Sequence, residues 1–245
     1  MKRFAIIGGT GVDSLPPEWG TESLTIETSH GSADVVIARK EDEELIFLIR
    51  HGKEHKIPPH MINYRANTMA LLQLGVTDVL ATNAVGSLRA DLPPGSLILL
   101  SDFIDYTRTR QRSFFTDDIV RHTDMSEPYS EKLGAALLKS ASELNIHLYG
   151  GGVYICVEGP RYESPAEVRL FAGWGADVVG MTGLPEASMA REAGLRYAGV
   201  AIVTNLACGL TDKTLNHGDV TREMKKCMGT VVSLLLSTAG EKRER

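Results

Sequence analysis

Residues 4–11 read FAIIGGTG, a short apolar run that ends in a glycine-rich turn. Such a run is typical of a buried β-strand, and the glycines mark the place where the chain leaves it. Comparable β-rich runs recur along the chain and are also predicted to be strands: residues 35–38, 45–49, 79–82, 97–100, 153–157, 178–180 and 197–203.

Segments with helical spacing lie between several of these runs, at residues 63–74, 131–144, 165–172, 185–192 and 220–237. Strands that alternate with helices predict an α/β fold, in which helices flank a mixed, largely parallel β-sheet. No linker rich in Ser, Gly or Pro divides the chain. We therefore expect a single domain over residues 1–240, followed by a charged C-terminal tail over 241–245.

The composition is that of an ordinary globular protein, with 43% hydrophobic and 23% charged residues among 245. Acidic residues outnumber basic ones by 31 to 26, and the resulting net charge of −5 argues against a nucleic-acid partner. No apolar stretch is long enough to span a bilayer, so no membrane partner is expected. Cys156, Cys208 and Cys227 are odd in number and lack CxxC spacing. This pattern favours a reducing compartment, and we expect a cytoplasmic protein.

The turn over residues 8–11 presents backbone N–H groups that can hold an anion, and the Thr10 hydroxyl adds a donor. A tight structural turn is the plain alternative. The dinucleotide fingerprint Gly-x-Gly-x-x-Gly is incomplete, because Ser14 takes its last position when the count starts at Gly9. No lysine followed by serine or threonine closes the turn, so it is not a P-loop. The sequence thus disfavours a nicotinamide cofactor.

Arg50 and His51 come directly after a very apolar predicted strand. Donor and cationic side chains are badly placed there unless they meet an anion or solvent, so oxyanion binding is the natural interpretation. The competing interpretation is zinc, since residues 51–55 satisfy the His-x-x-Glu-His pattern of some peptidases. That pattern needs a helix, and Gly52 with Pro58 nearby argues against one. No metal site is expected.

Three further segments follow predicted strands, where ligands gather in open α/β sheets. Residues 83–87 form a turn of small residues with free backbone amides. Residues 158–163 place Tyr162 beside Glu163, and a ring next to a carboxylate suits stacking on, and hydrogen bonding to, a nucleobase. Asn205 offers a donor and an acceptor, with turn capping as the alternative. The polar stretch 106–127 is expected to be a long loop that serves as a lid or subunit contact.

With these segments the chain resembles the trimeric purine nucleoside phosphorylases, in particular their methylthioadenosine phosphorylase branch. The resemblance covers nearly the whole length, and the segments that carry it are residues 6–11, 50–55, Asn63, Tyr64, Ala66, Asn67, 83–88, 158–161, 174–178, 181–186 and 204–209. It implies a phosphorolysis in which inorganic phosphate attacks C1′ of a purine nucleoside and releases the base and a pentose 1-phosphate. No cofactor is implied, because phosphate is a co-substrate.

The resemblance also implies roles for individual residues. Thr10, Arg50, His51, the backbone of Ala84 and Thr182 correspond to the phosphate site. Tyr162, Glu163 and Asn205 correspond to the base site, and Met181, His55 and His217 to the ribose and its 5′ group. We expect catalysis to depend on Arg50, His51 and Asn205, because charge separates between sugar and base as the bond breaks.

Two departures from the methylthioadenosine branch bear on the base. Asn205 and Ala207 stand where that branch has two aspartates, and Glu163 stands where it has a serine. A carboxylate accepts from N1–H of a 6-oxopurine, and an amide donates toward O6 or N7, whereas adenine offers the reverse pattern. We therefore predict a preference for hypoxanthine or guanine nucleosides.

The 5′ group is ambiguous by sequence. The N-terminal half, with His55, resembles enzymes for 5′-methylthio nucleosides, whereas His217 matches a histidine that contacts the 5′-hydroxyl in inosine and guanosine enzymes. We favour S-methyl-5′-thioinosine, with inosine or guanosine and then S-methyl-5′-thioadenosine as alternatives. A homotrimer is implied, in which His122 of a neighbour contributes to the site. Other classes left open are an NAD(P)-dependent reductase and a non-catalytic purine-binding protein.

Overall fold

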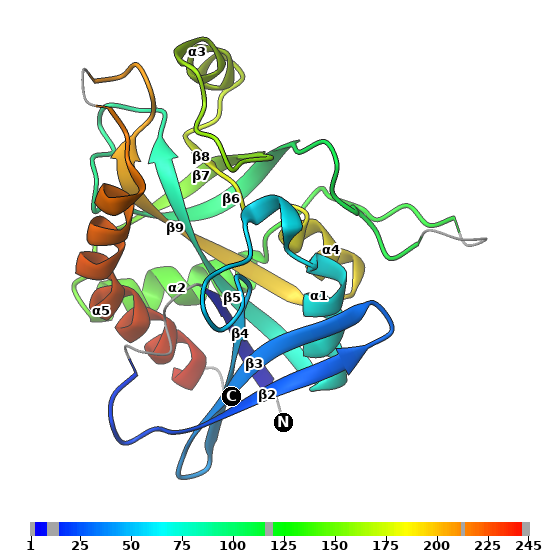
Figure 1. Cartoon of the computed structure of the whole chain (residues 1–245). Coiled ribbons are helices and arrows are strands. Elements are labelled where there is room, and N and C mark those ends of the chain that lie inside the picture. The colour runs from blue at the N-terminus through cyan, green and yellow to red at the C-terminus, as the bar shows by residue number, and fades with distance from the viewer. Residues whose placement is uncertain (1–2, 9–14, 116–119, 212–213, 242–245) are drawn as a thin grey trace.

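The computed structural model describes residues 3–8, 15–115, 120–211 and 214–241, and these contain a nine-stranded sheet (Figure 1). Its strands are β1 (Arg3–Gly8), β2 (Gly20–Thr28), β3 (Gly31–Lys40), β4 (Glu43–Ile49), β5 (Val76–Ser87), β6 (Leu97–Tyr106), β7 (Leu148–Val157), β8 (Val178–Gly180) and β9 (Arg196–Leu206). They are ordered β2-β3-β4-β1-β5-β8-β7-β6-β9. Because β5 also pairs with β9, five of these strands close into a ring.

The sheet is mixed, as predicted. β1 runs parallel to β4 and β5, β5 parallel to β9, and β7 parallel to β6 and β8. β2, β3 and β4 form an antiparallel meander at one edge. β2 was missed by the sequence analysis, because an exposed edge strand alternates polar and small residues and has no continuous apolar run.

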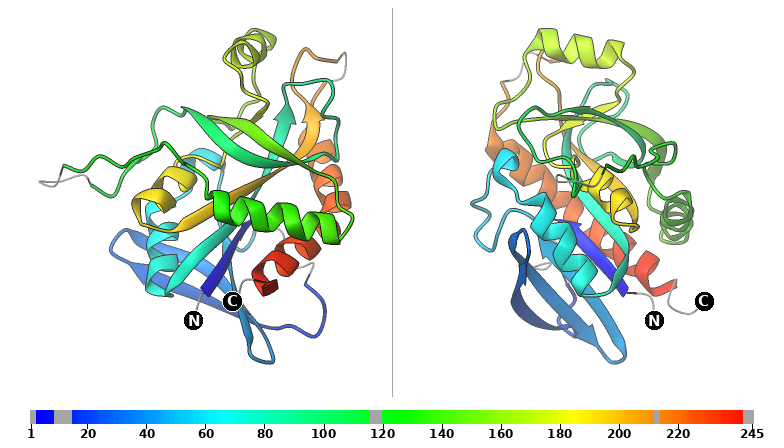
Figure 2. Two further views of the ribbon diagram at one scale, coloured as in Figure 1. Left: turned by 180° about the vertical axis from the view of Figure 1, so that it is seen from behind. Right: turned by 90° about the vertical axis from the view of Figure 1, so that its right-hand side faces the viewer.

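The helices are α1 (Tyr64–Gln73), α2 (Glu131–Glu143), α3 (Pro165–Gly173), α4 (Glu186–Glu192) and α5 (His217–Glu241), with a short 3₁₀ turn, η2 (Pro59–Met61). α1 and α4 pack on one face of the sheet, and α2 and α5 cover the other (Figure 2). α3 lies apart from the other helices, and its Val168 and Phe171 pack on β7 and β8. No described helix combines the length and apolar character needed to cross a membrane.

Local sequence explains where these helices begin. The Asn63 side chain accepts the Ala66 amide at the start of α1, and the Ser130 side chain accepts the Leu133 amide at the start of α2. α3 begins with a full capping box between Ser164 and Glu167. These caps place the helix starts within a residue or so of their predicted positions.

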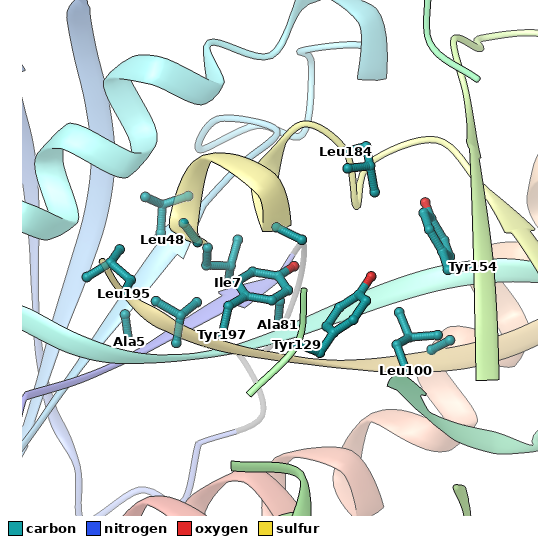
Figure 3. Packing of buried hydrophobic residues seen from close by; sticks show 14 of the residues in the cluster. Ala5, Ile7, Leu48, Ala81, Leu100, Tyr129, Tyr154, Leu184, Leu195 and Tyr197 are labelled. Atoms are coloured by element: carbon teal, nitrogen blue, oxygen red, sulfur yellow. The ribbon is translucent and has the colours of Figure 1, made fainter. Parts of the chain in front are cut away.

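The core on the α1 and α4 face contains three buried tyrosines, Tyr129, Tyr154 and Tyr197 (Figure 3). The rings of Tyr129 and Tyr197 lie 5.9 Å apart between centroids. The Tyr154 and Tyr197 hydroxyl groups make hydrogen bonds to residues of other elements, so the polar ends of these two side chains constrain how those elements are arranged.

Two predicted boundaries are wrong in the same direction. Residues 83–87 belong to β5 and are not a turn, and Asn205 lies within β9 and does not follow it. In both cases the strand continues past its apolar run because polar residues at its carboxyl end still pair with a neighbouring strand. The segment after β6 has no helix or strand in its described residues 107–115 and 120–130 and extends from the body, as predicted (Figure 1).

Candidate functional site

A break in strand pairing along β5 creates the centre of the site. On one edge, β5 pairs with β1 as far as Ala81 and with β8 from Gly86 onward. Within the described sheet, residues 82–85 therefore have no partner strand on this edge. Backbone N–H and C=O groups alternate between the edges of a strand, so the Ala84 amide points to the same edge as the Thr82 carbonyl. Ala84 is exposed between two buried neighbours, which shows that the face is open here.

Arg50 reaches this break from the end of β4. Its Nη1 donates to the Thr82 carbonyl at 2.7 Å, and its Nε and Nη2 donate to the Glu186 carboxylate at 2.9 and 2.6 Å. Burial is the largest single influence on the Arg50 guanidinium and lowers its pKa, but the charge and hydrogen bond of Glu186, with Tyr197 and Tyr64, together raise the pKa above its usual value. These bonds use three of the five N–H donors of the guanidinium and leave two for a ligand. Arg50 is thus a fixed, permanent cation.

His51 follows Arg50 in a turn, not in the helix that a zinc peptidase motif requires. Its Nδ1 lies 2.8 Å from the Ile57 carbonyl, which can only accept, so Nδ1 carries the proton. Burial, and then the charges of Arg50 and His55, lower the His51 pKa to about 4. The ring is therefore neutral near pH 7, and its Nε2 presents a lone pair.

Thr182 approaches the same break from the segment after β8. Its hydroxyl oxygen accepts a hydrogen bond from Asn83 Nδ2 at 3.0 Å, so its own proton remains available for a ligand. Gly8, at the end of β1, also lies against this part of β5, because a Cβ built there would lie 3.0 Å from Thr82 Oγ1. The structure thus brings Arg50, Ala84 and Thr182 to this break, with His51 next to Arg50 in sequence, and we call these four residues, which the sequence predicts to bind phosphate, the phosphate side.

Thr10 and the glycines after Gly8 lie outside the described residues. The prediction that Thr10 belongs to this cluster therefore stays a prediction. The described residue nearest to Thr10 in sequence is Gly8, which lies beside Thr82.

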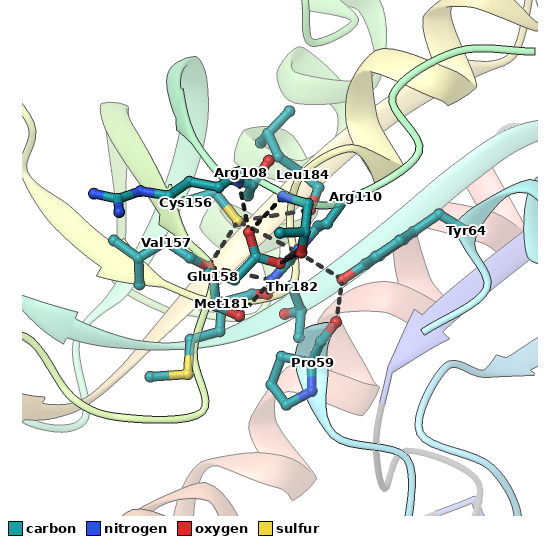
Figure 4. Close-up of polar contacts among 12 residues, drawn as sticks. Pro59, Tyr64, Arg108, Arg110, Cys156, Val157, Glu158, Met181, Thr182 and Leu184 are labelled. Carbon is teal, nitrogen blue, oxygen red and sulfur yellow. Dashed lines mark hydrogen bonds and ion pairs between the residues drawn. The ribbon is translucent and has the colours of Figure 1, made fainter. Parts of the chain in front are cut away.

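Met181 connects the phosphate side to the segment that follows β7. A Cβ at Gly159 would lie 2.6 Å from the Met181 sulfur, so the two segments are in direct contact. Arg110 holds them together from the long loop, with Nη2 donating to the carbonyls of Glu158 at 2.8 Å and Met181 at 2.7 Å (Figure 4). Met181 is half-buried, as expected of a side chain that borders a ligand.

Glu163 lies further along the same segment and is only 7% exposed. Loss of water is the largest influence on its carboxyl group and raises its pKa. Burial raises the pKa of the Cys208 thiol, and the negative charge of Glu163 raises it further, because the two side chains are near each other. The same two segments also touch at Gly209, where a Cβ would lie 2.8 Å from Pro165. Glu163 therefore lies beside the residues that follow β9.

Asn205 projects from the end of β9. Its Oδ1 accepts from the Thr204 hydroxyl at 2.9 Å, and its Nδ2 donates to the Leu206 carbonyl at 3.0 Å. Its Nδ2 also borders β5, since a Cβ at Gly86 would lie 3.1 Å from it. These two bonds identify the nitrogen end of the amide, whose second N–H is left as a donor for a ligand. We call Tyr162, Glu163 and Asn205 the base side; Tyr162 is half-buried beside Glu163.

Of the three remaining predicted site residues, His55 contacts the phosphate side, and no contact among the described residues joins His122 to either side. His55 is exposed, and its ring packs on His51 with 4.5 Å between centroids. His217 begins α5, but its side chain is outside the described part of the structure. His122 is exposed on the long loop.

Sequence reasoning missed Glu186, Arg110 and Tyr154. A signal existed for Glu186, because a buried arginine needs a counterion and Glu186 opens a helix whose next four residues are small or apolar. Nothing local marks Arg110 or Tyr154, whose partners lie 28 to 74 positions away.

A family model described as the phosphorylase superfamily matches residues 3–239. A protein of Pyrococcus furiosus named 6-oxopurine nucleoside phosphorylase is 44% identical over 244 residues, which are 97% of this chain and 92% of that protein. One of Methanocaldococcus jannaschii, named probable S-methyl-5′-thioinosine phosphorylase, is 42% identical over 95% of this chain and 90% of its own. The solved structure of methylthioadenosine phosphorylase from Schistosoma mansoni with adenine has a TM-score of 0.92 and 32% identity, covering 99% of this chain and 92% of that one.

Proposed function

Because the chain belongs to the phosphorylase superfamily, we propose that it cleaves 6-oxopurine nucleosides with inorganic phosphate. An oxygen of hydrogen phosphate bonds to C1′ as the C1′–N9 bond breaks, and the electron pair of that bond stays with the base. The proton of hydrogen phosphate ends on the base, so the products are the free purine and a pentose 1-phosphate. Phosphate is the co-substrate, and the proposal requires no cofactor.

The phosphate side suits hydrogen phosphate. Arg50 has two N–H groups left, Thr182 has its hydroxyl proton, and the Ala84 amide faces the same break. The neutral His51 supplies the complementary group, because its Nε2 can accept the one proton of hydrogen phosphate. The anion held there would face the positive charge that develops on the sugar, which lowers the barrier to cleavage.

The observation that carries the substrate class is the orientation of Asn205. Its Nδ2 donates to the Leu206 carbonyl, which can only accept, and its Oδ1 accepts from the Thr204 hydroxyl, so the amide nitrogen is identified and has one N–H left, which suits O6 or N7 of a 6-oxopurine. Glu163 would accept from N1–H of the same base. Adenine would leave a carboxylate opposite the N1 lone pair, at a cost of about 1 to 3 kcal/mol. The names of two relatives, a 6-oxopurine nucleoside phosphorylase and a probable S-methyl-5′-thioinosine phosphorylase, support this substrate class.

The test is release of free base from inosine, guanosine, adenosine, methylthioadenosine and methylthioinosine, with and without phosphate. We expect phosphate-dependent release of hypoxanthine and a kcat/KM at least tenfold lower for the adenine nucleosides. Equal or greater kcat/KM for adenine nucleosides would contradict the base assignment. Release that does not depend on phosphate would contradict the reaction itself.

For the 5′ group we propose S-methyl-5′-thioinosine, which gives hypoxanthine and S-methyl-5-thioribose 1-phosphate. Inosine or guanosine is the second candidate, and His217 distinguishes them. If His217 contacts a 5′-hydroxyl, His217→Ala lowers kcat/KM for inosine and spares methylthioinosine. Equal losses on both substrates would remove that role.

We propose further that the protein is a cytoplasmic homotrimer in which His122 of a neighbouring subunit completes the site. Support comes from the exposed position of His122 on a loop that extends from the body. Sedimentation should give a trimer, and mixing subunits carrying His122→Ala with subunits carrying Arg50→Ala should restore part of the activity.

A further inference from the structure

Tyr154 binds the segment that carries Thr182, although it belongs to a different strand. It lies in β7 and is fully buried. Its hydroxyl oxygen accepts the backbone N–H of Thr182 at 3.2 Å and of Gly183 at 3.1 Å. The hydroxyl proton points to the Cys156 sulfur at 3.8 Å. A phenol has one donor and room for two acceptor contacts, so this hydroxyl is fully used.

The segment after β8 is shaped around the Tyr154 ring. A Cβ at Gly180 would lie 2.6 Å from the Tyr154 hydroxyl oxygen, and one at Gly183 would lie 2.8 Å from Cε1. Real Cβ atoms do not approach so closely, so only glycine permits the ring to lie against the backbone here. Tyr154 and these two glycines therefore form one packed unit around Thr182.

Arg110 holds the carbonyl groups of the same segment. Its Nη2 donates to the Met181 carbonyl at 2.7 Å, and its Nη1 donates to the Leu184 carbonyl (Figure 4). Two side chains from distant parts of the chain thus fix the backbone from Met181 to Leu184, one through its amides and one through its carbonyls. Little freedom is left for the Thr182 backbone.

We propose that Tyr154 is a positioning residue that aims the Thr182 hydroxyl at phosphate. The Thr182 oxygen accepts from Asn83, which takes one of its three tetrahedral directions, and the position of the backbone determines where the other two point. Tyr154 sets that backbone and touches no ligand itself. This inference rests on the proposed function, because it takes Thr182 as a phosphate residue.

Tyr154→Phe removes only the hydroxyl group, and Tyr129→Phe is its matched control. Tyr129 lies in the same core cluster and is 5% exposed, but its hydroxyl has no hydrogen-bond partner among the residues that the structure describes. For Tyr154→Phe we expect KM for phosphate to rise about tenfold and KM for the nucleoside to change less than about twofold. Tyr129→Phe should leave both unchanged. A merely structural loss would lower the melting temperature without separating the two KM values.

A double-mutant cycle with Thr182→Ala tests whether Tyr154 acts through Thr182. We expect the double variant to have the phosphate KM of Thr182→Ala alone, because the positioned group is already gone. If Tyr154→Phe is too unstable to assay, the rise in melting temperature on adding phosphate gives the same affinity from the unfolding curve.

These measurements distinguish failure of the positioning role from failure of the proposed function. If Thr182→Ala raises the phosphate KM and Tyr154→Phe does not, the positioning role is wrong and the proposed function stands. Additive effects in the double variant, or parallel changes in both KM values, overturn it as well. If Thr182→Ala itself leaves the phosphate KM unchanged, the assignment of Thr182 in the proposed function is wrong, and the inference falls with it.

Discussion

Arg50 on the phosphate side binds Glu186, 136 positions away, and Thr182 binds Asn83, 99 positions away. The Asn205 side chain on the base side makes its described hydrogen bonds to its neighbours, Thr204 and Leu206. Glu163 stands just before the capping box of α3, and burial is the largest influence on its pKa. The side-chain hydrogen bonds of the phosphate side therefore join distant elements, and those of Asn205 join adjacent residues of one strand.

With the proposed roles, this difference would let one family keep a reaction and vary its base. We expect substitutions next to Asn205 or Glu163 to change which purine fits with little effect on the long-range hydrogen bonds of the phosphate side. Changes at Arg50 or its partners would disturb the sheet, α4 and the core together. The similar proteins carry names that share phosphorolysis and differ in the nucleoside, as this arrangement leads one to expect.

The largest effect should come from Glu186→Gln, which leaves the Arg50 charge buried without its counterion. Both side chains are 3% exposed, and Tyr197 also donates to this carboxylate at 2.7 Å. We expect a loss of about 3 to 5 kcal/mol in the free energy of unfolding, measured by urea denaturation. The control is Glu143→Gln, whose ion pair with Lys139 is exposed and should cost less than about 0.5 kcal/mol. Similar results for both variants would contradict the comparison.

A Glu→Gln substitution on the base side should lower activity and leave stability intact. Glu163→Gln removes a carboxylate whose charge is disfavoured by burial, so stability should stay the same or rise. The kcat/KM for 6-oxopurine nucleosides should fall on the order of 100-fold, or about 3 kcal/mol, because N1–H loses a charged acceptor. KM for phosphate should not change. A large loss of stability without loss of base selection would reverse the proposed roles of the two sides.

The pH dependence of stability tests the phosphate side without a ligand. The His51 pKa is about 4 in the folded protein, against an ordinary value near 6.5 in the unfolded chain. Between these values the unfolded chain binds a proton that the folded one does not, so stability falls as pH falls through this window and is full above it. We expect His51 to contribute a loss of about 2 kcal/mol between pH 7 and pH 5. His51→Gln should remove that part of the slope, and an unchanged slope would show that His51 is not held neutral.

The smallest effect should come from Thr204→Val, which frees the Asn205 amide to rotate. The lost hydrogen bond should cost about 1 kcal/mol, or about fivefold in kcat/KM for 6-oxopurine nucleosides, with the phosphate KM unchanged. Adenine nucleosides should lose less, because a rotated amide presents an acceptor to the 6-amino group. Equal losses on both purines would mean that Thr204 does not set the orientation of Asn205.

The family and fold predicted from sequence are confirmed, and the reason lies in the kind of signal each used. Apolar runs and helical spacing are local patterns that determine local structure, so most strands and helices lie close to their predicted positions. Arg50 was recognisable because a cation directly after an apolar strand requires a partner. Its internal partner, Glu186, came from a distant helix and could not be deduced from spacing. The roles of the individual site residues remain predictions.

The sequence alone determined the α/β class, most of the strands and helices, and the residue types predicted to read a keto purine, since these follow from local periodicity and side-chain chemistry. The tertiary structure decided the break in pairing along β5, the closure of β5 onto β9, and the way Tyr154 and Arg110 hold the segment around Thr182. Each of these joins groups far apart in the chain. Contacts of that kind depend on packing in three dimensions, which no local pattern of residues records.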